Sequence, residues 1–318
     1  GAFSATAGAC RAMEMDPGTT AHALAIAGTA NNALRVSRTG DLSHWKGLAF
    51  PHVAGAAVRA ALLARRGITG PLEVFEGVKG WRDSVSGEWE LNWEEEDLEM
   101  VLNTDLKRYN AETHSQSAIE GLLELLDEED IAGEEIREMQ AEVFDTAYLI
   151  IGGGKESSKT DIQTKEQADH SLPYLLAVAA LDREVLPRQY EPERIRRDDV
   201  QDLLKRVEVT PRDDLSRRFP REHPCRVTVV TKEGGSFTRE KSSYKGFHDQ
   251  PLPWELSRRK LMELGSGRVN RSWLREMSDV VENLEEAGMG AFTSLLSLGR
   301  RGPGPGSEDM ETESGPGW

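Results

Sequence analysis

Cysteine is scarce in this chain of 318 residues, which contains only Cys10 and Cys225. The two lie far apart in the sequence, and neither belongs to a Cys-x-x-Cys pair. This scarcity excludes a disulfide framework, a cysteine-rich zinc site and a thiol redox motif. An iron–sulfur cluster also needs more thiolates than two. We therefore expect a reduced compartment and chemistry that requires neither a metal nor a cofactor.

Long hydrophobic runs are missing as well. The longest apolar stretches, residues 54–63 and 172–181, are shorter than the roughly 20 residues that span a bilayer. The chain does not begin with the charged and then apolar segments of a signal peptide. Its first residues lack an initiating Met and resemble the middle of an alanine-rich helix. We expect a soluble, cytoplasmic protein without membrane contact, and the opening suggests a fragment.

Positive charge is in deficit, with 39 Lys and Arg against 55 Asp and Glu and a net charge of −16. Nucleic acid phosphates require a basic face, so this composition argues against a nucleic-acid partner. Acidity with arginine in excess of lysine suggests a halophilic source. In molar salt the screening length falls to about 3 Å, so the net charge would hardly repel an anionic substrate.

Helical patterns dominate both ends of the chain. Residues 1–64 are rich in alanine at helical spacing, and Pro51 is expected in the first turn of a helix over residues 53–65. Residues 113–116 have the spacing of a capping box. Further helices are predicted over residues 115–126, 171–181, 200–207, 255–263 and 272–285.

Strand patterns lie between these helices. Residues 135–144 alternate in polarity, and residues 226–231 and 236–239 flank a Gly-Gly turn, which predicts a hairpin. The order indicates a mainly α fold with an α+β part, in which an all-helical domain is interrupted by the α+β segment. Residues 299–318 have almost nothing to bury and are predicted to be a disordered tail.

Three segments place polar or basic residues at the start of a predicted helix, namely residues 43–52, 107–116 and 168–174. Helix amino termini have unpaired N–H groups and a partial positive charge, which favour carboxylates. If the three segments converge, they form a cradle for a polyanion. Taken singly, each is better explained by helix capping and solvation.

In this order the three segments resemble signatures of the MmgE/PrpD family. Trp45-Lys46-Gly47 resembles the family's lysine segment, and Ala111-Glu112 followed by His114-Ser115-Gln116 is similar to the Ala-Glu-x-His-Ser-Gln segment of 2-methylcitrate dehydratases. Residues 165–174 are the most distinctive match. The resemblance covers about residues 1–295 and is specific in combination. Asn110 stands where proline is usual.

This resemblance implies an all-helical domain and an α+β lid domain, with the site at their junction, in a homodimer. Carried onto this chain, it places the first part of the helical domain at 1–102, the lid at 103–257, the return segment at 258–298 and the tail at 299–318. It also implies additional upstream chain with aspartate and histidine site residues. We therefore expect the family's N-terminal portion to be lacking and the site to be incomplete.

The resemblance also implies which residues form the site. Together with polar neighbours in the same segments, the candidate catalytic residues are Lys107, Glu112, His114, His170 and Tyr174. The candidate substrate-binding residues are Lys46, Arg108 and Gln116, and no metal ligands are expected. The remaining histidines have no ligand spacing and are expected to be structural or exposed: His22, His44, His52, His223 and His248.

The implied activity is that of a metal-independent hydro-lyase of propionate catabolism, which dehydrates 2-methylcitrate or a related tricarboxylate to the cis-alkene. Such a reaction needs a base, an acid and cations that hold the carboxylates. Glu112 favours dehydration, because the family's cis-aconitate decarboxylase branch has histidine at this position. A decarboxylase-like lyase and a non-catalytic fragment or partner subunit remain the alternatives.

Overall fold

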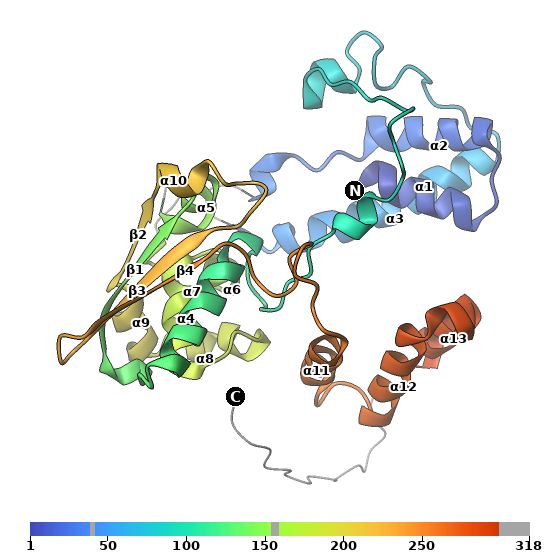
Figure 1. Ribbon diagram of the computed structural model, residues 1–318. Helices are drawn as coiled ribbons and strands as arrows, with labels where there is room; N and C mark the ends of the chain where they lie inside the picture. Colours follow the sequence, from blue (N-terminus) through green and yellow to red (C-terminus); the bar gives the residue numbers. More distant parts are fainter. Residues whose placement is uncertain (39–41, 154–158, 299–318) are drawn as a thin grey trace.

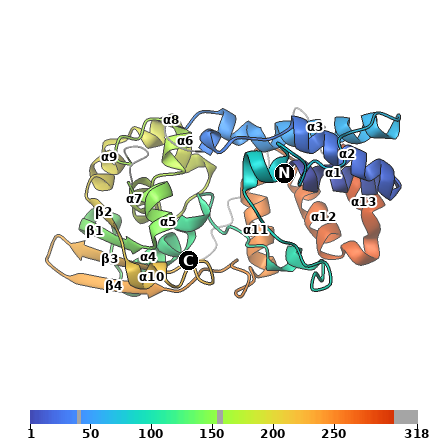
Figure 2. The same ribbon diagram turned by 90° about the horizontal axis from the view of Figure 1, so that it is seen from above.

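The computed structural model describes residues 1–38, 42–153 and 159–298. Two groups of helices flank an α+β part in the sequence, and both groups lie on the same side of that part in two perpendicular views (Figures 1 and 2). The chain leaves the helical region and returns to it, which confirms a mainly α fold with an α+β part. The predicted domain boundaries stay predictions, and the predicted tail lies outside the described residues.

The first helical group is built from close-packed alanines. It contains α1 (Ala2–Ala12), α2 (Pro17–Ala30) and α3 (Trp45–Arg65), with a short 3₁₀ turn, η1 (Arg35–Arg38), before α3. Asp16 begins α2 by accepting the Thr19 N–H at 3.0 Å, and Pro17 occupies the first turn, where its missing N–H is not needed. Small side chains on all three helices allow their backbones to approach closely.

The helix α3 is longer than predicted. It begins at Trp45 and contains Pro51 in its interior, where proline removes one hydrogen bond without ending the helix. By length and composition this helix is apolar enough to cross a membrane, which corrects the expectation that no run suffices. A core helix of a soluble protein has the same signature, and one face of α3, including Ala57 and Ala61, is buried against α1 and α2. The opposite face leaves Leu48 and Leu62 exposed.

Residues 66–115 connect the two parts with little regular structure. They contain a π-helical turn, η2 (Arg82–Ser86), and two 3₁₀ turns, η3 (Met100–Asn103) and η4 (Thr113–Ser115). Main-chain bonds hold the end of this connection in place, because the Leu106 N–H donates to the Gly246 carbonyl oxygen at 2.7 Å. The His248 N–H donates to Asp105 Oδ1 at 2.8 Å.

The α+β part contains a sheet of four strands in the order β2-β1-β3-β4. The strands are β1 (Ile136–Val143), β2 (Val207–Pro211), β3 (Cys225–Thr231) and β4 (Ser236–Lys241). β1 pairs in parallel with β2 and antiparallel with β3, and β3 and β4 form the predicted hairpin. The prediction of a helix through residue 207 is wrong, since α9 (Asp198–Leu204) ends earlier and Val207 begins β2.

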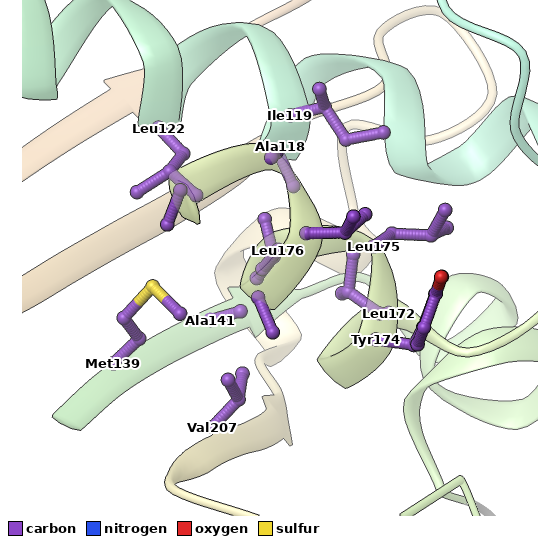
Figure 3. Packing of buried hydrophobic residues seen from close by; sticks show 14 of the residues in the cluster. Ala118, Ile119, Leu122, Met139, Ala141, Leu172, Tyr174, Leu175, Leu176 and Val207 are labelled. Atoms are coloured by element: carbon purple, nitrogen blue, oxygen red, sulfur yellow. The ribbon is translucent and has the colours of Figure 1, made fainter. Parts of the chain in front are cut away.

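Helices cover this sheet and enclose the main hydrophobic core. α4 (Gln116–Glu128) packs on β3 and β4, and α7 (Leu172–Asp182) packs on α4, α9 and β2. Figure 3 shows side chains of α4, α7, β1 and β2 meeting in this core. The shorter helical elements are η5 (Gly133–Glu135), α5 (Asp145–Ala147), η6 (Tyr148–Gly152), α6 (Lys165–Ala168), η7 (Pro187–Tyr190), α8 (Pro192–Ile195) and α10 (Asp213–Ser216).

The second helical group consists of α11 (Trp254–Gly265), α12 (Arg271–Glu282) and α13 (Leu284–Leu298). α12 packs on both neighbours, and Gly288 interrupts α13 with a positive φ of 74°, a conformation that glycine adopts without strain. α11 lies nearest the α+β part (Figure 1). α11 is therefore the element of the return segment that can contact the α+β part.

Candidate active site where the helical and α+β parts meet

Lys46 joins the helical part to the α+β part. It lies in the first turn of α3, and its Nζ lies 2.9 Å from His170 Nδ1 and 3.5 Å from Asp169 Oδ1. Asp169 and His170 lie between α6 and α7, where Ser171 begins α7 by accepting the Tyr174 N–H. The structure thus brings together the first and third predicted segments, which are more than 120 residues apart in the sequence.

The three side chains form a compact, half-enclosed charge cluster with exposed fractions of 12–19%. Burial lowers the pKa of Lys46 below its usual value, although Asp169 acts in the opposite direction. Burial raises the pKa of Asp169, but the hydrogen bond and charge of His170, together with Lys165 and Lys46, outweigh it and bring the value to about 2. Asp169 is therefore an ionised carboxylate at neutral pH.

His170 Nδ1 contacts two partners, one of which is a hydrogen-bond acceptor and the other a donor. It lies 2.5 Å from Asp169 Oδ1, which accepts a hydrogen, and 2.9 Å from Lys46 Nζ, which as an ammonium donates one. A ring nitrogen carries either one hydrogen or one lone pair, so it satisfies one of these partners at a time. The cluster can therefore exchange a proton with little movement of the chain.

A second carboxylate and imidazole pair lies beside the first. Glu112 Oε1 is 2.7 Å from His114 Nδ1, and Glu112 Oε2 accepts the His114 N–H at 2.7 Å. Burial raises the pKa of Glu112, but the hydrogen bonds from His114 and the charges of His114 and His170 bring it below the usual value. The Glu112 N–H donates to the Asp169 carbonyl oxygen at 3.2 Å and so connects the two pairs.

The two pairs share one contact, although His170 Nδ1 also faces Lys46. In each, a carboxylate lies against Nδ1, and in the part of the chain that the structure describes no hydrogen bond is formed to either Nε2 atom. Where the carboxylate accepts the hydrogen of Nδ1, it fixes the tautomer and leaves Nε2 to accept or donate a proton. Two such groups side by side can supply an acid and a base to one substrate.

Aromatic rings hold His114 in place. His114 stacks on His223 at 5.5 Å between ring centroids and lies edge-on to Phe144 at 5.5 Å. His223 is buried, as its structural assignment predicted, and burial lowers its pKa to about 4. The rings of Phe219 and Phe247 also pack on His223. Packing against these rings therefore fixes the position of the His114 imidazole in the second pair.

Lys107 lies one peptide unit from the second pair. Its Nζ donates to the Ala111 carbonyl oxygen at 2.9 Å, directly before Glu112. Arg108 points elsewhere, because its guanidinium bonds the buried Glu120 carboxylate at 2.9 Å and stacks over the Tyr109 ring. The charge of Arg108 is thus paired inside the protein, and the structure does not bring it to the two pairs.

Two other predicted site residues have structural surroundings. Gln116 is fully buried, accepts the Tyr109 N–H at 2.9 Å and donates to the Tyr109 carbonyl oxygen at 3.2 Å. Tyr174 is fully buried beside Leu172 and Leu175 (Figure 3), and its hydroxyl donates to the Gln189 carbonyl oxygen. We assign both to support of the site rather than to contact with a substrate.

Local details also differ from the sequence expectation. The predicted capping box is wrong, because Glu112 accepts the His114 N–H while Ser115 makes no side-chain cap to α4. The Asn110 N–H donates to the Val185 carbonyl oxygen at 3.0 Å, a bond that proline lacks the hydrogen to form. Sequence reasoning also missed Asp169 as a site residue. Its position directly before the candidate residue His170 could have indicated it.

A cavity of about 510 Å³ lies between the end of α2 and the start of α3. Its lining includes Trp45, His52 and Asn31. None of the predicted site residues lines it. The acid and base groups are therefore found in the cluster around Lys46 rather than in this cavity.

The fold and the cluster define a mainly α protein with an α+β part, which carries acid and base groups and cations where the two parts meet. Residues 1–94 match the MmgE/PrpD N-terminal domain, and residues 109–286 match the MmgE/PrpD C-terminal domain. The chain belongs to the MmgE/PrpD family. The N-terminal domain, which was expected to be lacking in part, is thus represented here.

Curated relatives match shorter segments. A cis-aconitate decarboxylase of Mus musculus is 26% identical over 123 residues, which is 39% of this chain and 25% of that protein. A cis-aconitate decarboxylase of Homo sapiens is 25% identical over 142 residues, 45% of this chain and 29% of that protein. The matched part of the chain therefore spans less than a third of the length of either relative.

Proposed function

We propose that this chain acts as a hydro-lyase that removes water from 2-methylcitrate, or a closely related tricarboxylate, by metal-independent acid–base chemistry and forms the cis-alkene. The observation that carries this proposal is the pairing of Asp169 with His170 directly beside the pairing of Glu112 with His114. Membership in the MmgE/PrpD family supports a lyase. Glutamate at position 112, where the family's cis-aconitate decarboxylase branch has histidine, supports dehydration.

Dehydration breaks one C–H bond and one C–O bond. A base takes the proton from the carbon next to a carboxylate, the electron pair forms the double bond, and the hydroxyl leaves as water with a proton from an acid. His114 and His170 serve these roles through Nε2, one neutral and the other protonated. Substituting each histidine in turn assigns the roles. Loss of the base removes the acidic limb of the pH dependence of kcat/KM, and loss of the acid removes the alkaline limb.

Cations complete the proposed site. The ammonium groups of Lys46 and Lys107 lie at the first and second pair, respectively. In the reaction they hold substrate carboxylates and stabilise the negative charge that develops as the carbon loses its proton. At Lys46, whose side chain is only 19% exposed, such a charge acts more strongly than it would in water.

Decarboxylation of cis-aconitate is the second candidate function. It is favoured by the names of the mouse and human relatives, whose matched segments cover 25% and 29% of their lengths. The two candidates differ in a product that is simple to measure. Only decarboxylation releases carbon dioxide, and only dehydration creates a conjugated alkene from a saturated substrate.

The test is to incubate the full chain with 2-methylcitrate in high salt and follow the absorbance of the alkene, and in parallel to supply cis-aconitate and measure carbon dioxide. We expect absorbance to rise and no gas to form. With the fold intact, His170→Asn should lower kcat by about 10²- to 10⁴-fold, as loss of an acid or base does. Lys107→Ala should lower kcat by about 10²- to 10³-fold, as loss of a group that stabilises developing negative charge does. Lys205→Ala is the matched control, because this exposed lysine has no side-chain hydrogen bond or ion pair among the described residues.

The outcomes test the residue roles and separate the candidate functions. Near-normal turnover of Lys107→Ala would remove Lys107 from the site. Carbon dioxide from cis-aconitate without alkene from 2-methylcitrate would favour the decarboxylase. No product in either assay would refute a catalytic role of this chain and leave a non-catalytic fragment or partner subunit.

A further inference from the structure

A lysine of the return segment reaches the loop that carries Lys107. Lys260 lies in α11 and is partly buried, and its Nζ donates to the main-chain carbonyl oxygen of Lys107. The Lys107 side chain extends from the same residue to the Ala111 carbonyl oxygen. The second helical group thus contributes a cation next to the α+β part.

The loop between them is firmly held. The Leu106 N–H donates to the Gly246 carbonyl oxygen at 2.7 Å, and Asp105 accepts the His248 N–H at 2.8 Å. These bonds hold residues 105–107 against the loop that leads into α11. Tertiary contacts therefore fix the main chain of Lys107, which Lys260 contacts, although Lys107 itself is exposed.

Neither ammonium has a carboxylate to neutralise it. In the described ranges no Asp or Glu oxygen lies within 4.0 Å of Lys107 Nζ or Lys260 Nζ, and both contact only carbonyl oxygens. The neighbouring cations differ, since Arg108 and Lys241 both pair with the buried Glu120 carboxylate. Burial and the charge of Lys107 lower the pKa of Lys260, so the uncompensated charges affect one another.

Two unneutralised cations side by side repel each other, and an anion placed between them removes this repulsion. Lys107 in turn lies one peptide unit from Glu112 and the second carboxylate and imidazole pair. An anionic group held by both lysines would therefore belong to a molecule that also reaches the acid and base groups. A carboxylate of a polycarboxylate substrate fits this arrangement.

We propose that Lys260 is a further substrate-binding residue and that, together with Lys107, it binds one carboxylate of the substrate. The identity of the anion rests on the proposed function, whereas the binding of an anion by the two lysines does not. The role is one of binding rather than of proton transfer, so KM should change more than kcat.

The experiment measures binding of propane-1,2,3-tricarboxylate, which has no hydroxyl to eliminate, by calorimetry on the full chain, and steady-state kinetics with 2-methylcitrate. Lys260→Gln keeps a donor for the Lys107 carbonyl oxygen but removes the charge, and Lys260→Arg keeps the charge. Lys205→Gln removes a charge at an exposed lysine at the end of α9 and is the matched control. Melting temperatures of all variants check that the fold is retained.

We expect Lys260→Gln to raise the Kd for the tricarboxylate by about tenfold or more, as the loss of one charge-assisted hydrogen bond predicts, and to raise KM similarly. Lys260→Arg should retain most of the affinity, and Lys205→Gln should bind as the unmodified protein does. Unchanged binding by Lys260→Gln, equal losses in the Gln and Arg variants, or no binding by the unmodified protein would each overturn the inference.

The same data separate this inference from the proposed function. Binding that depends on Lys260 without any alkene formation would leave the lysine pair standing and refute the hydro-lyase. Alkene formation with a KM that Lys260→Gln does not change would support the hydro-lyase and refute substrate binding by the two lysines.

Discussion

The buried imidazole of His223 predicts how the stability of this protein changes between neutral and acidic pH. His223 is 8% exposed, and its Nδ1 has no hydrogen-bond partner among the described residues. Burial, aided by the charge of His114, lowers its pKa from 6.5 to about 4, although the carboxylates of Asp105 and Glu112 act in the opposite direction. The folded protein therefore resists protonation of this ring.

The direction of the effect follows from which state binds the proton. As the pH falls through 6.5, the unfolded chain protonates His223, whereas the folded protein does so only near 4. The unfolded state binds more protons in this window, so the free energy of unfolding falls with pH from about 6.5 to about 4. At about 1.4 kcal/mol per pH unit, this gap corresponds to a loss of about 3 kcal/mol.

His223→Phe isolates this contribution, because phenylalanine fits the aromatic surroundings and does not titrate. Urea unfolding of the variant and the unmodified protein at several pH values gives a difference in unfolding free energy. We expect that difference to shift in favour of the variant by about 3 kcal/mol between pH 7 and pH 4. His52→Phe, at an exposed ring, is the control. A difference that stays constant over this range would refute the reasoning.

The remaining predictions concern two buried side chains that support the site. Gln116→Ala leaves the buried Tyr109 N–H and carbonyl without their partner, so urea unfolding should show a loss of about 2–3 kcal/mol, and a loss below about 0.5 kcal/mol would contradict this role. Tyr174→Phe leaves the Gln189 carbonyl unpaired and should cost about 1–3 kcal/mol with kcat for alkene formation unchanged, whereas a 100-fold drop in kcat at full stability would place the hydroxyl in the reaction.

Local elements could be predicted because their causes lie within a few residues. The hairpin of β3 and β4 follows from alternating β-branched residues around a Gly-Gly turn, and α7 follows from Ser171 with Pro173 in its first turn. The parallel strand β2 was missed because its partner β1 lies more than 60 residues away. A short strand whose partner is distant carries no local signal of its pairing.

The sequence by itself determined which segments carry the polar groups and which parts of the chain form helices and strands, since spacing and capping act locally. Only the tertiary structure decided which of those groups meet. It brings Lys46 to Asp169 and His170, although the sequence separates them by more than 120 residues. Burial and partner choice, which no local pattern encodes, pair Arg108 with Glu120, enclose the Tyr174 ring, and leave Lys107 and Lys260 without a counter-charge within the described residues.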